Sequence, residues 1–381
     1  MNNGSIYKIR TTTKKGVKVR YRGQLSIGKN DNGKPRYKCV DADTWADCKK
    51  RLATLKRDLE KGLDVDNHQT VGEYLKDWFE QRVKIRTKVV TQSSYQMHLN
   101  NHLKHFAGTK LRALTPQQVQ QWLNAEIKKD ERSTRAILYS HSILRSALND
   151  AVKWRVLEFN PALAVDLPKQ PRFRAQPWSP EEARQFLDCI QEHRLRSLYT
   201  MALLTGMRQG ELLALQWTDL DLDNGTTRVE HTLTRVKGTG LVRTCTKTEA
   251  SERIQYLPQS VVATLREHKL RQDEERGNRE WWNSKGWVFV TRDGYPIDAC
   301  NLSNDFVALL KKHNLRRVRF HDCRHFAASA AIASGASVKA VSEMLGHSSP
   351  ATTLQVYAHS FQSAKRALAN HMDTVLTPET K

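Results

Sequence analysis

A tyrosine near the carboxyl end of the chain follows basic and imidazole side chains that could hold a phosphate. Tyr357 stands ten positions after His347, and a serine-proline pair at 349–350 favours a short helix that would present the phenol. Arg208 lies in Leu-Thr-Gly-Met-Arg-Gln-Gly-Glu, where glycines interrupt helices on both sides. A guanidinium at such a joint can bind a phosphate through two hydrogen bonds, and Glu211 could brace it. These residue types suit attack on a phosphodiester, although Arg208 and Glu211 could equally form an ordinary surface ion pair.

A second group, Phe-His-Asp-Cys-Arg-His at 320–325, begins an alanine-rich segment. His321 and Arg324 are one helical turn apart, so they share a face and could contact one anion together. Ordinary polar residues at a helix start would look the same. Zinc is a further alternative, because His321 and His325 stand four residues apart. No third ligand accompanies them, and we expect no metal site.

The segment from 331 to 357 also imitates a helix-turn-helix. Ser337 can cap a helix after a break at Gly335, and the next helix would begin near Ser349. In that interpretation the protein is a DNA-binding regulator without catalytic activity, and Tyr357 is a packing residue. The local pattern leaves this alternative open.

The overall charge indicates a polyanionic partner. The 381 residues include 62 Lys and Arg against 40 Asp and Glu, a formal net charge of +22, and the sequence pI is about 9.8. Such a field attracts nucleic acid. No run of 18 apolar residues and no amino-terminal apolar stretch is present, which argues against a membrane protein or a secreted one. The six cysteines form no C-x-x-C pair, so we expect neither disulfides nor a thiolate zinc site, and a reducing cytoplasm fits best.

The elements that must position these side chains differ along the chain, and the first segment is the most basic. Residues 1–65 carry 17 Lys and Arg against 7 Asp and Glu. β-Forming runs punctuated by turn residues predict a small three-stranded sheet followed by a helix. The runs lie at 6–10, 17–22, 24–27 and 36–40, and the helix is expected at 44–61.

The next hundred residues or so change to amphipathic helical periodicity, which predicts an all-helical domain over 66–166. Thr115-Pro116 is a clear start signal, because the hydroxyl caps the first turn and proline has no amide to leave unpaired. The four helices are expected near 70–83, 91–106, 116–128 and 133–155. We interpret three histidines as DNA-facing or surface residues, since no cysteine or carboxylate cluster accompanies them. They are His98, His102 and His105.

Three prolines and three basic side chains predict an extended, positively charged linker over 167–177. The last segment, 178–381, mixes helices and strands. Helices are expected after Ser179-Pro180 and through 198–204, strands are expected at 227–236 and 253–257, and Trp281-Trp282 should cover the edge of a core. The fold class is therefore multidomain and mainly α with small β-sheets, an α+β arrangement.

The order of the chemical residues carries more information than any single motif. In this order the chain resembles the tyrosine recombinase family, the phage and transposon integrases and their chromosome-resolving relatives. The resemblance rests on Arg208, Lys247 within Thr-Lys-Thr, His321-x-x-Arg324, Leu-Gly-His347 and Tyr357. It covers the carboxyl half, and it implies that 178–381 is the catalytic domain, that 66–166 binds the core site, and that 1–65 binds arm-type DNA sites.

The resemblance also implies a mechanism. The enzyme would be a site-specific recombinase that cleaves and rejoins DNA through a 3′-phosphotyrosyl intermediate, integrating or excising a mobile element without ATP, metal or cofactor. Arg208 and Arg324 would clamp the scissile phosphate, and His347 would donate a hydrogen bond to it. Lys247 would give a proton to the departing 5′-hydroxyl, while His321 would take the proton of Tyr357. Glu211 would support Arg208.

The partners implied by the resemblance are double-stranded DNA, carrying core and arm attachment sites, and further copies of the chain in a homotetramer. A helix at 361–372 is a candidate for docking on a neighbouring subunit. An excisionase and a DNA-bending host factor fit an enzyme with an arm-binding segment, and the location would be the cytoplasm of a bacterial host. A type IB topoisomerase-like activity, which relaxes DNA and rejoins the same strands, is the alternative with the same chemistry.

Overall fold

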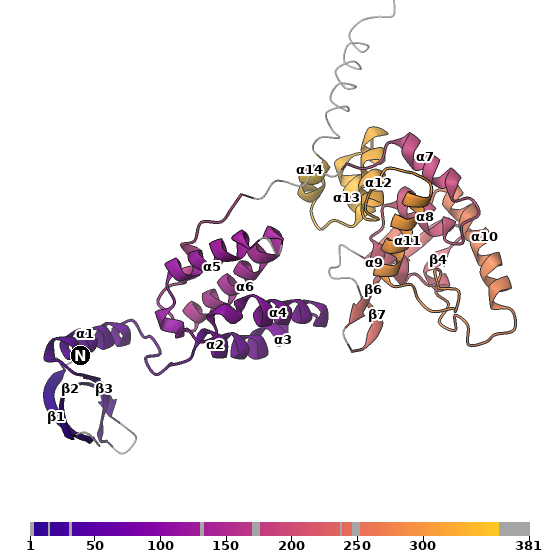
Figure 1. Ribbon diagram of the computed structural model, residues 1–381. Coiled ribbons are helices and arrows are strands. Elements are labelled where there is room, and N and C mark those ends of the chain that lie inside the picture. The colour runs from indigo at the N-terminus through magenta and orange to yellow at the C-terminus, as the bar shows by residue number, and fades with distance from the viewer. Residues whose placement is uncertain are drawn as a thin grey trace, which may run out of the picture. The chain divides into compact units, whose positions relative to one another are not determined.

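The computed structural model describes residues 4–13, 16–29, 33–129, 133–169, 176–236, 238–245 and 252–357. The chain divides into two compact units, Met1–Pro171 and Arg172–Lys381, and each is described by itself (Figure 1). Helices dominate both units and the sheets are small and antiparallel, so the predicted fold class is confirmed. None of the described helices is long and apolar enough to span a lipid bilayer.

The first unit begins with a three-stranded antiparallel sheet of β1 (Ser5–Thr13), β2 (Gly16–Lys29) and β3 (Pro35–Ala42), followed by α1 (Trp45–Glu60). Two of the predicted β-forming runs belong to the single strand β2. Gly23 lies between them within the strand, where a Cβ atom would approach Cys48 Sγ to 3.2 Å. The glycine therefore marks the close approach of α1 to the sheet and not a turn.

The rest of this unit is a helical bundle whose main helices agree with the predicted periodicity. Thr70, Thr115 and Ser133 each accept a backbone N–H of the first turn and so start three of the helices. The helices are α2 (Val71–Trp78), a π-helical turn (Phe79–Val83), α3 (Lys84–Arg86), α4 (Val89–Asn101), α5 (Pro116–Lys128) and α6 (Thr134–Lys153). Short 3-10 turns cover Leu103–Phe106, Leu111–Ala113 and Pro161–Leu163.

The prediction for the histidines of the bundle is wrong for two of the three. His98 and His102 are buried, at 4% and 6% exposure, while His105 is exposed. His98 Nδ1 lies 2.7 Å from Ser140 Oγ on α6, and burial lowers the pKa of His98. These two rings therefore belong to the interior, because α4 turns them toward α6 and away from solvent.

The second unit contains the mixed part of the chain. Its helices are α7 (Pro180–Cys189), α8 (Arg196–Thr205), α9 (Gln209–Ala214), α10 (Gln259–Arg276), α11 (Ala299–Lys312), α12 (Asp322–Ala333), α13 (Val338–Leu345) and α14 (Pro350–Tyr357). One sheet joins β4 (Leu220–Asp221), β5 (Thr226–Val229) and β8 (Arg253–Tyr256), and a hairpin joins β6 (His231–Val236) and β7 (Gly240–Cys245). The expected strand at 227–236 is thus two strands, which belong to different sheets.

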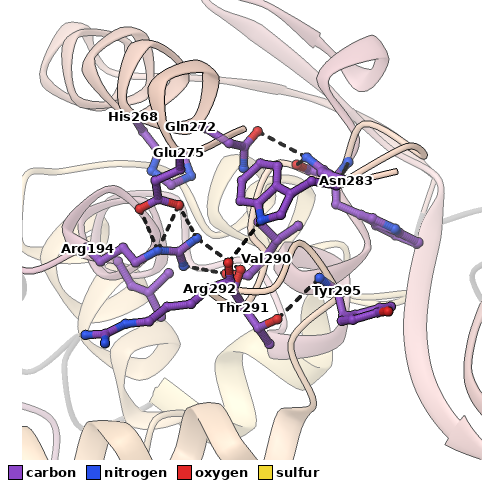
Figure 2. A network of polar contacts seen from close by, with 12 residues as sticks. Arg194, His268, Gln272, Glu275, Asn283, Val290, Thr291, Arg292 and Tyr295 are labelled. Atoms are coloured by element: carbon purple, nitrogen blue, oxygen red, sulfur yellow. Dashed lines mark hydrogen bonds and ion pairs between the residues drawn. The ribbon is translucent and has the colours of Figure 1, made fainter. Parts of the chain in front are cut away.

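An aromatic core organises this unit, and the irregular segment after α10 is fixed to it by polar contacts. Arg194 donates to both carboxylate oxygens of Glu275 and to the carbonyls of Val290 and Thr291, as Figure 2 shows. Trp282 is buried at 1% exposure, but its neighbour Trp281 is 60% exposed. The two tryptophans, both predicted to cover the edge of a core, therefore differ: Trp282 lies inside the core and Trp281 lies at the surface.

Candidate active site

Two glycine turns bring the separated chemical residues together. Gly206 ends α8 and Gly346 ends α13, each in the left-handed conformation with φ of 63° and 64°. A Cβ atom on Gly206 would lie 2.9 Å from Leu345 Cδ2, so the two turns pack closely. Figure 1 shows α12, α13 and α14 as neighbours in yellow, consistent with the packing between these helices.

Arg324 on α12 ties the two turns to each other. Its guanidinium is 4% exposed and donates to the carbonyls of Gly206 and Leu345, both at 2.7 Å. Burial, and then the positive charge of Arg208, lower the pKa of Arg324 to about 10, which still leaves it charged near neutral pH. A buried cation held by neutral carbonyls favours an anionic ligand nearby.

Arg208 caps the start of α9 and is anchored by Glu211, as its spacing predicted. Glu211 is 3% exposed, and its two carboxylate oxygens accept from Arg208 Nη1 at 2.7 Å and from the Arg208 backbone N–H at 3.0 Å. Arg208 Nη2 donates to the carbonyl of Gly346 at 2.9 Å. Its side chain keeps 38% exposure, so the guanidinium is fixed in direction and still accessible to an anion.

Arg253 is a member of this network that sequence reasoning missed. It starts β8, donates to Glu211 Oε2 at 3.0 Å and to the carbonyl of Met344 at 3.0 Å, and its side chain is 9% exposed. Burial disfavours the charged form of Glu211, but Arg253 and Arg208 outweigh it and hold the pKa of Glu211 below its ordinary value. No local pattern marks Arg253, because its partners stand far from it in the sequence.

His347 follows the Gly346 turn and is half-buried. Its Nδ1 lies 2.9 Å from Thr353 Oγ1 on α14. Burial first, and then the charges of Arg324, Arg208 and Arg253, lower the pKa of His347 to about 4. The ring is therefore neutral near pH 7, and in the tautomer in which Thr353 donates to Nδ1 the hydrogen of the ring is on Nε2 and can be donated.

Tyr357 is the last residue of α14 and is buried at 2% exposure among apolar side chains of α12 and α13. Its hydroxyl lies 2.9 Å from Nδ1 of His325. Burial raises the pKa of Tyr357 to about 12, against the effect of Arg324, which lowers it. The histidine within hydrogen-bond distance of this phenol is thus His325, which the sequence pattern presented only as a zinc alternative.

His321 stands at the amino end of α12, and its side chain reaches the surface. Its ring centroid lies 5.2 Å from that of His325, in an edge-to-face arrangement. Desolvation first, and then the charges of His325, Arg324 and Arg319, lower the pKa of His321 to about 4. Within the described ranges, no three His, Cys, Asp or Glu side chains are grouped to hold a metal ion.

Lys247 and the predicted helix at 361–372 lie outside the described residues, as do residues 170–175 of the predicted linker. The hairpin of β6 and β7, which ends at Cys245 just before Lys247, packs on α9, where a Cβ on Gly210 would lie 2.4 Å from Thr232 Oγ1. The strand β8 then begins at Arg253. The described residues before and after Lys247 therefore belong to two strands, β7 and β8, which lie close to the network of Arg208, Arg253 and Glu211.

The site as a whole carries excess positive charge. Arg208 and Arg253 share one carboxylate, Glu211, while Arg324 is held by neutral carbonyls. Among the described residues, the partners named above for these three guanidiniums include a single carboxylate, so net positive charge is left for an anion such as a phosphodiester. The phenol of Tyr357 is close to them, since its hydroxyl lies 2.9 Å from Nδ1 of His325, the residue that follows Arg324.

Comparison with known proteins shows the family to which the chain belongs. Residues 178–364 match the model of the phage integrase family, and residues 70–127 match the phage integrase N-terminal SAM-like domain. The chain is 30% identical over 377 residues to a tyrosine recombinase XerC-like protein of Caldanaerobacter subterraneus subsp. tengcongensis, covering 93% of this chain and 96% of that protein. It is 28% identical to the ICEBs1 integrase of Bacillus subtilis strain 168, over 73% and 76% of the two chains.

Solved structures share the fold. The Tn1549 transposon integrase in complex with transposon right end DNA has a TM-score of 0.68 and 22% identity, over 80% of this chain and 100% of that one. The lambda integrase tetramer bound to a Holliday junction has a TM-score of 0.56 and 16% identity, over 88% and 91%. With the match along nearly the whole length of a tyrosine recombinase, these findings show that the chain belongs to the tyrosine recombinases of the phage integrase family and is a site-specific integrase.

Proposed function

We propose that this integrase breaks DNA by attack of Tyr357 on a phosphodiester held by Arg208 and Arg324. The observation that carries the proposal is the cluster of Arg208 and Arg253 on the Glu211 carboxylate, close to the buried Arg324. The Tyr357 hydroxyl is next to this cluster, 2.9 Å from Nδ1 of the residue that follows Arg324. A phosphodiester resists attack because its negative charge repels nucleophiles and its leaving alkoxide is poor. The guanidiniums address the first difficulty by binding the non-bridging oxygens.

We infer the bond changes from the roles that we assign to these side chains. The Tyr357 oxygen forms a bond to phosphorus as the bond to the 5′-oxygen breaks, and the product is a 3′-phosphotyrosyl ester with a free 5′-hydroxyl. His347 donates from Nε2 to the phosphate, and Lys247 supplies the proton of the departing hydroxyl. The ester conserves the energy of the phosphodiester, so a 5′-hydroxyl of another strand reverses the step without ATP or a metal.

The larger organisation is part of the same proposal. We assign 1–65 to binding of arm-type sites, 66–166 to binding of the core site, 167–177 to a basic linker and 178–381 to catalysis. The charge of +22 supports contacts with the phosphates of double-stranded DNA. A homotetramer is supported by the lambda integrase tetramer, a relative in fold that is bound to a Holliday junction. An excisionase, a DNA-bending factor and a docked carboxyl-terminal helix at 361–372 complete the assembly that we propose in a bacterial cytoplasm.

The test is the covalent adduct. Duplexes of random sequence, each nicked near the centre, serve as the probe, because cleavage beside the nick releases a short end and traps the protein on the DNA. The wild-type protein should select duplexes that stay attached after denaturation. Tyr357→Phe should bind the selected duplexes in a native gel and yield no adduct, since it lacks the nucleophilic oxygen.

The same selected duplexes separate the rival activities. Exchange of strands between two differently labelled duplexes is expected of a recombinase, whereas relaxation of a supercoiled plasmid without exchange indicates a topoisomerase. An adduct that persists in Tyr357→Phe contradicts the assignment of the nucleophile. A wild-type protein that binds DNA and never forms an adduct contradicts the whole mechanism and favours a non-catalytic regulator.

A further inference from the structure

We propose that His325, and not His321, accepts the proton of the Tyr357 phenol when the phenol attacks the phosphate. The inference rests on the proposed function, because it names the base for the nucleophile of that reaction. It also changes the expectation from the family resemblance, which assigned this proton to His321.

The first support is the contact with the reacting atom. The Tyr357 hydroxyl lies 2.9 Å from His325 Nδ1, a normal length for a hydrogen bond between a phenol and an imidazole. The ring centroids are 5.6 Å apart at an interplanar angle of 61°, so the two rings meet edge to face. A base must be within hydrogen-bond reach of the proton that it removes, and His325 meets this condition.

The second support is the position of His325 on α12. It directly follows Arg324, whose guanidinium is fixed by the carbonyls of Gly206 and Leu345. One helical turn therefore holds both a cation for the phosphate and an acceptor for the phenolic proton. A shift of α12 would move the two groups together, so the geometry between phosphate and base is conserved during such a motion.

The third support is the burial of the phenol. Tyr357 is 2% exposed and belongs to an apolar cluster with Ala328 and Leu345, so water has little access to this side chain. A phenol with its pKa raised by burial does not ionise in advance near neutral pH. Its proton must leave during the attack, and the acceptor has to be a protein group already in place.

The step balances without a further reactant. A lone pair of the Tyr357 oxygen forms the bond to phosphorus, and the phenolic proton moves to His325 Nδ1. The bond from phosphorus to the 5′-oxygen breaks, and this oxygen takes the proton that Lys247 supplies; in the return step the attacking 5′-hydroxyl gives that proton back to Lys247. His325 is then an imidazolium. When a 5′-hydroxyl attacks the phosphotyrosyl ester, the phenolate leaves and recovers the proton from His325. His321, at the exposed end of the helix, is left free to contact the phosphate.

Two substitutions of His325 separate proton transfer from simple positioning. His325→Asn places an amide oxygen near the position of Nδ1, so it can accept the hydrogen bond of Tyr357 but cannot take up its proton. His325→Ala removes both functions. His313→Asn, at the end of α11, is the matched control for loss of a histidine outside the site. Thermal unfolding of each variant verifies that it is folded.

The assay measures the rate of adduct formation on nicked duplexes selected by the wild-type protein. We expect both His325 variants to be slower by a factor on the order of 100 to 10,000, the usual effect of a general base. The control variant should keep the wild-type rate. Replacement of Tyr357 by 3,5-difluorotyrosine, a more acidic phenol, should recover most of the lost rate in the His325→Asn protein, because a more acidic phenol needs a weaker base.

Other outcomes overturn the inference. A His325→Asn protein that cleaves at the wild-type rate shows that the hydrogen bond only positions the phenol. If the rate lost in His325→Asn is not recovered with difluorotyrosine, the role of His325 is structural. If difluorotyrosine recovers the rate of a His321→Asn protein and not that of His325→Asn, the base is His321. In each case the wild-type adduct still forms, so failure of this inference is distinct from failure of the proposed function, in which the wild-type protein makes no adduct.

Discussion

At the scale of single residues, the site is controlled by one buried carboxylate. Glu211 binds the Arg208 side chain, the Arg208 backbone and Arg253 at once. Each contact is a charge-assisted hydrogen bond to a buried carboxylate, and for such a group the loss of a partner is costly. The carboxylate neutralises only part of the charge of the neighbouring guanidiniums, so the site stays positive.

Glu211→Gln is therefore expected to damage both stability and catalysis. The amide keeps one acceptor oxygen but brings an NH2 group against a guanidinium, so at least one arginine loses its partner. We expect the free energy of unfolding to fall by about 1 to 3 kcal/mol, measured by urea denaturation. The rate of adduct formation should fall at least tenfold, because Arg208 is no longer fixed in direction.

Glu80→Gln is the matched control, since the ion pair of Glu80 with Lys84 is about half exposed. Exposed pairs of this kind contribute roughly 1 kcal/mol or less. Equal losses of stability in the two variants would refute the importance assigned to burial. Normal cleavage by Glu211→Gln would refute the role of the carboxylate in orienting Arg208.

At the scale of elements, the active site forms where helix ends meet. The turns that end α8 and α13 present carbonyls to Arg324, which lies with His325 on the first turn of α12. The hairpin of β6 and β7 supports α9 from the other direction. The chemistry thus depends on the close approach of these ends, and glycine is needed where they touch.

Gly206→Ala tests this dependence. The residue has φ of 63°, and its new Cβ would lie 2.9 Å from Leu345 and 3.1 Å from Ala327. We expect destabilisation of roughly 2 kcal/mol or more from backbone strain and overpacking, and a loss of cleavage larger than the loss of stability explains, because the carbonyl bound to Arg324 moves.

Gly286→Ala provides the control for backbone strain alone. Its φ is 67°, and nothing lies within 4 Å of the added atom. This variant should cost only about 1 kcal/mol and should keep the wild-type rate of adduct formation. If both alanine variants cleave equally well, the contact between the two turns does not position Arg324.

At the scale of the whole molecule, the main features are the net positive charge and the separation of the chain into parts that can bind DNA independently. Two compact units carry the described elements, and the first sheet and helix belong to the most basic stretch of sequence. Phosphate contacts supply affinity without sequence information, while base contacts supply specificity. Separate parts of one chain can therefore bind separate sites on DNA.

Removal of residues 1–65 is expected to separate these activities. The shortened protein should still form the adduct on selected core duplexes, because the residues that we propose for catalysis lie after residue 200. It should lose binding to arm sequences, identified by footprinting of the full chain on the DNA flanking its core site. Unchanged arm protection by the shortened protein would contradict the assignment, as would loss of core cleavage in a shortened protein that remains folded.

Much of the fold and of the candidate site could be predicted from the sequence. Capping residues such as Thr70, Thr115 and Ser179 start helices through contacts within one turn, and Glu211 braces Arg208 from three positions away. Such local contacts depend on few neighbours, so spacing alone predicts them. The charge and the order of the chemical residues likewise pointed to a DNA-cleaving enzyme before any contact was known.

Other features were decided by the packing of distant segments. Arg253 reaches Glu211 from 42 positions away, and His325 reaches Tyr357 from 32. The burial of His98 and the assignment of β5 and β6 to different sheets also depend on which faces meet. The periodicity of a sequence shows that one face of a helix will be covered, but it does not show which side chain of another element covers that face. For this reason, the choice between His321 and His325 as the partner of Tyr357 required the tertiary structure.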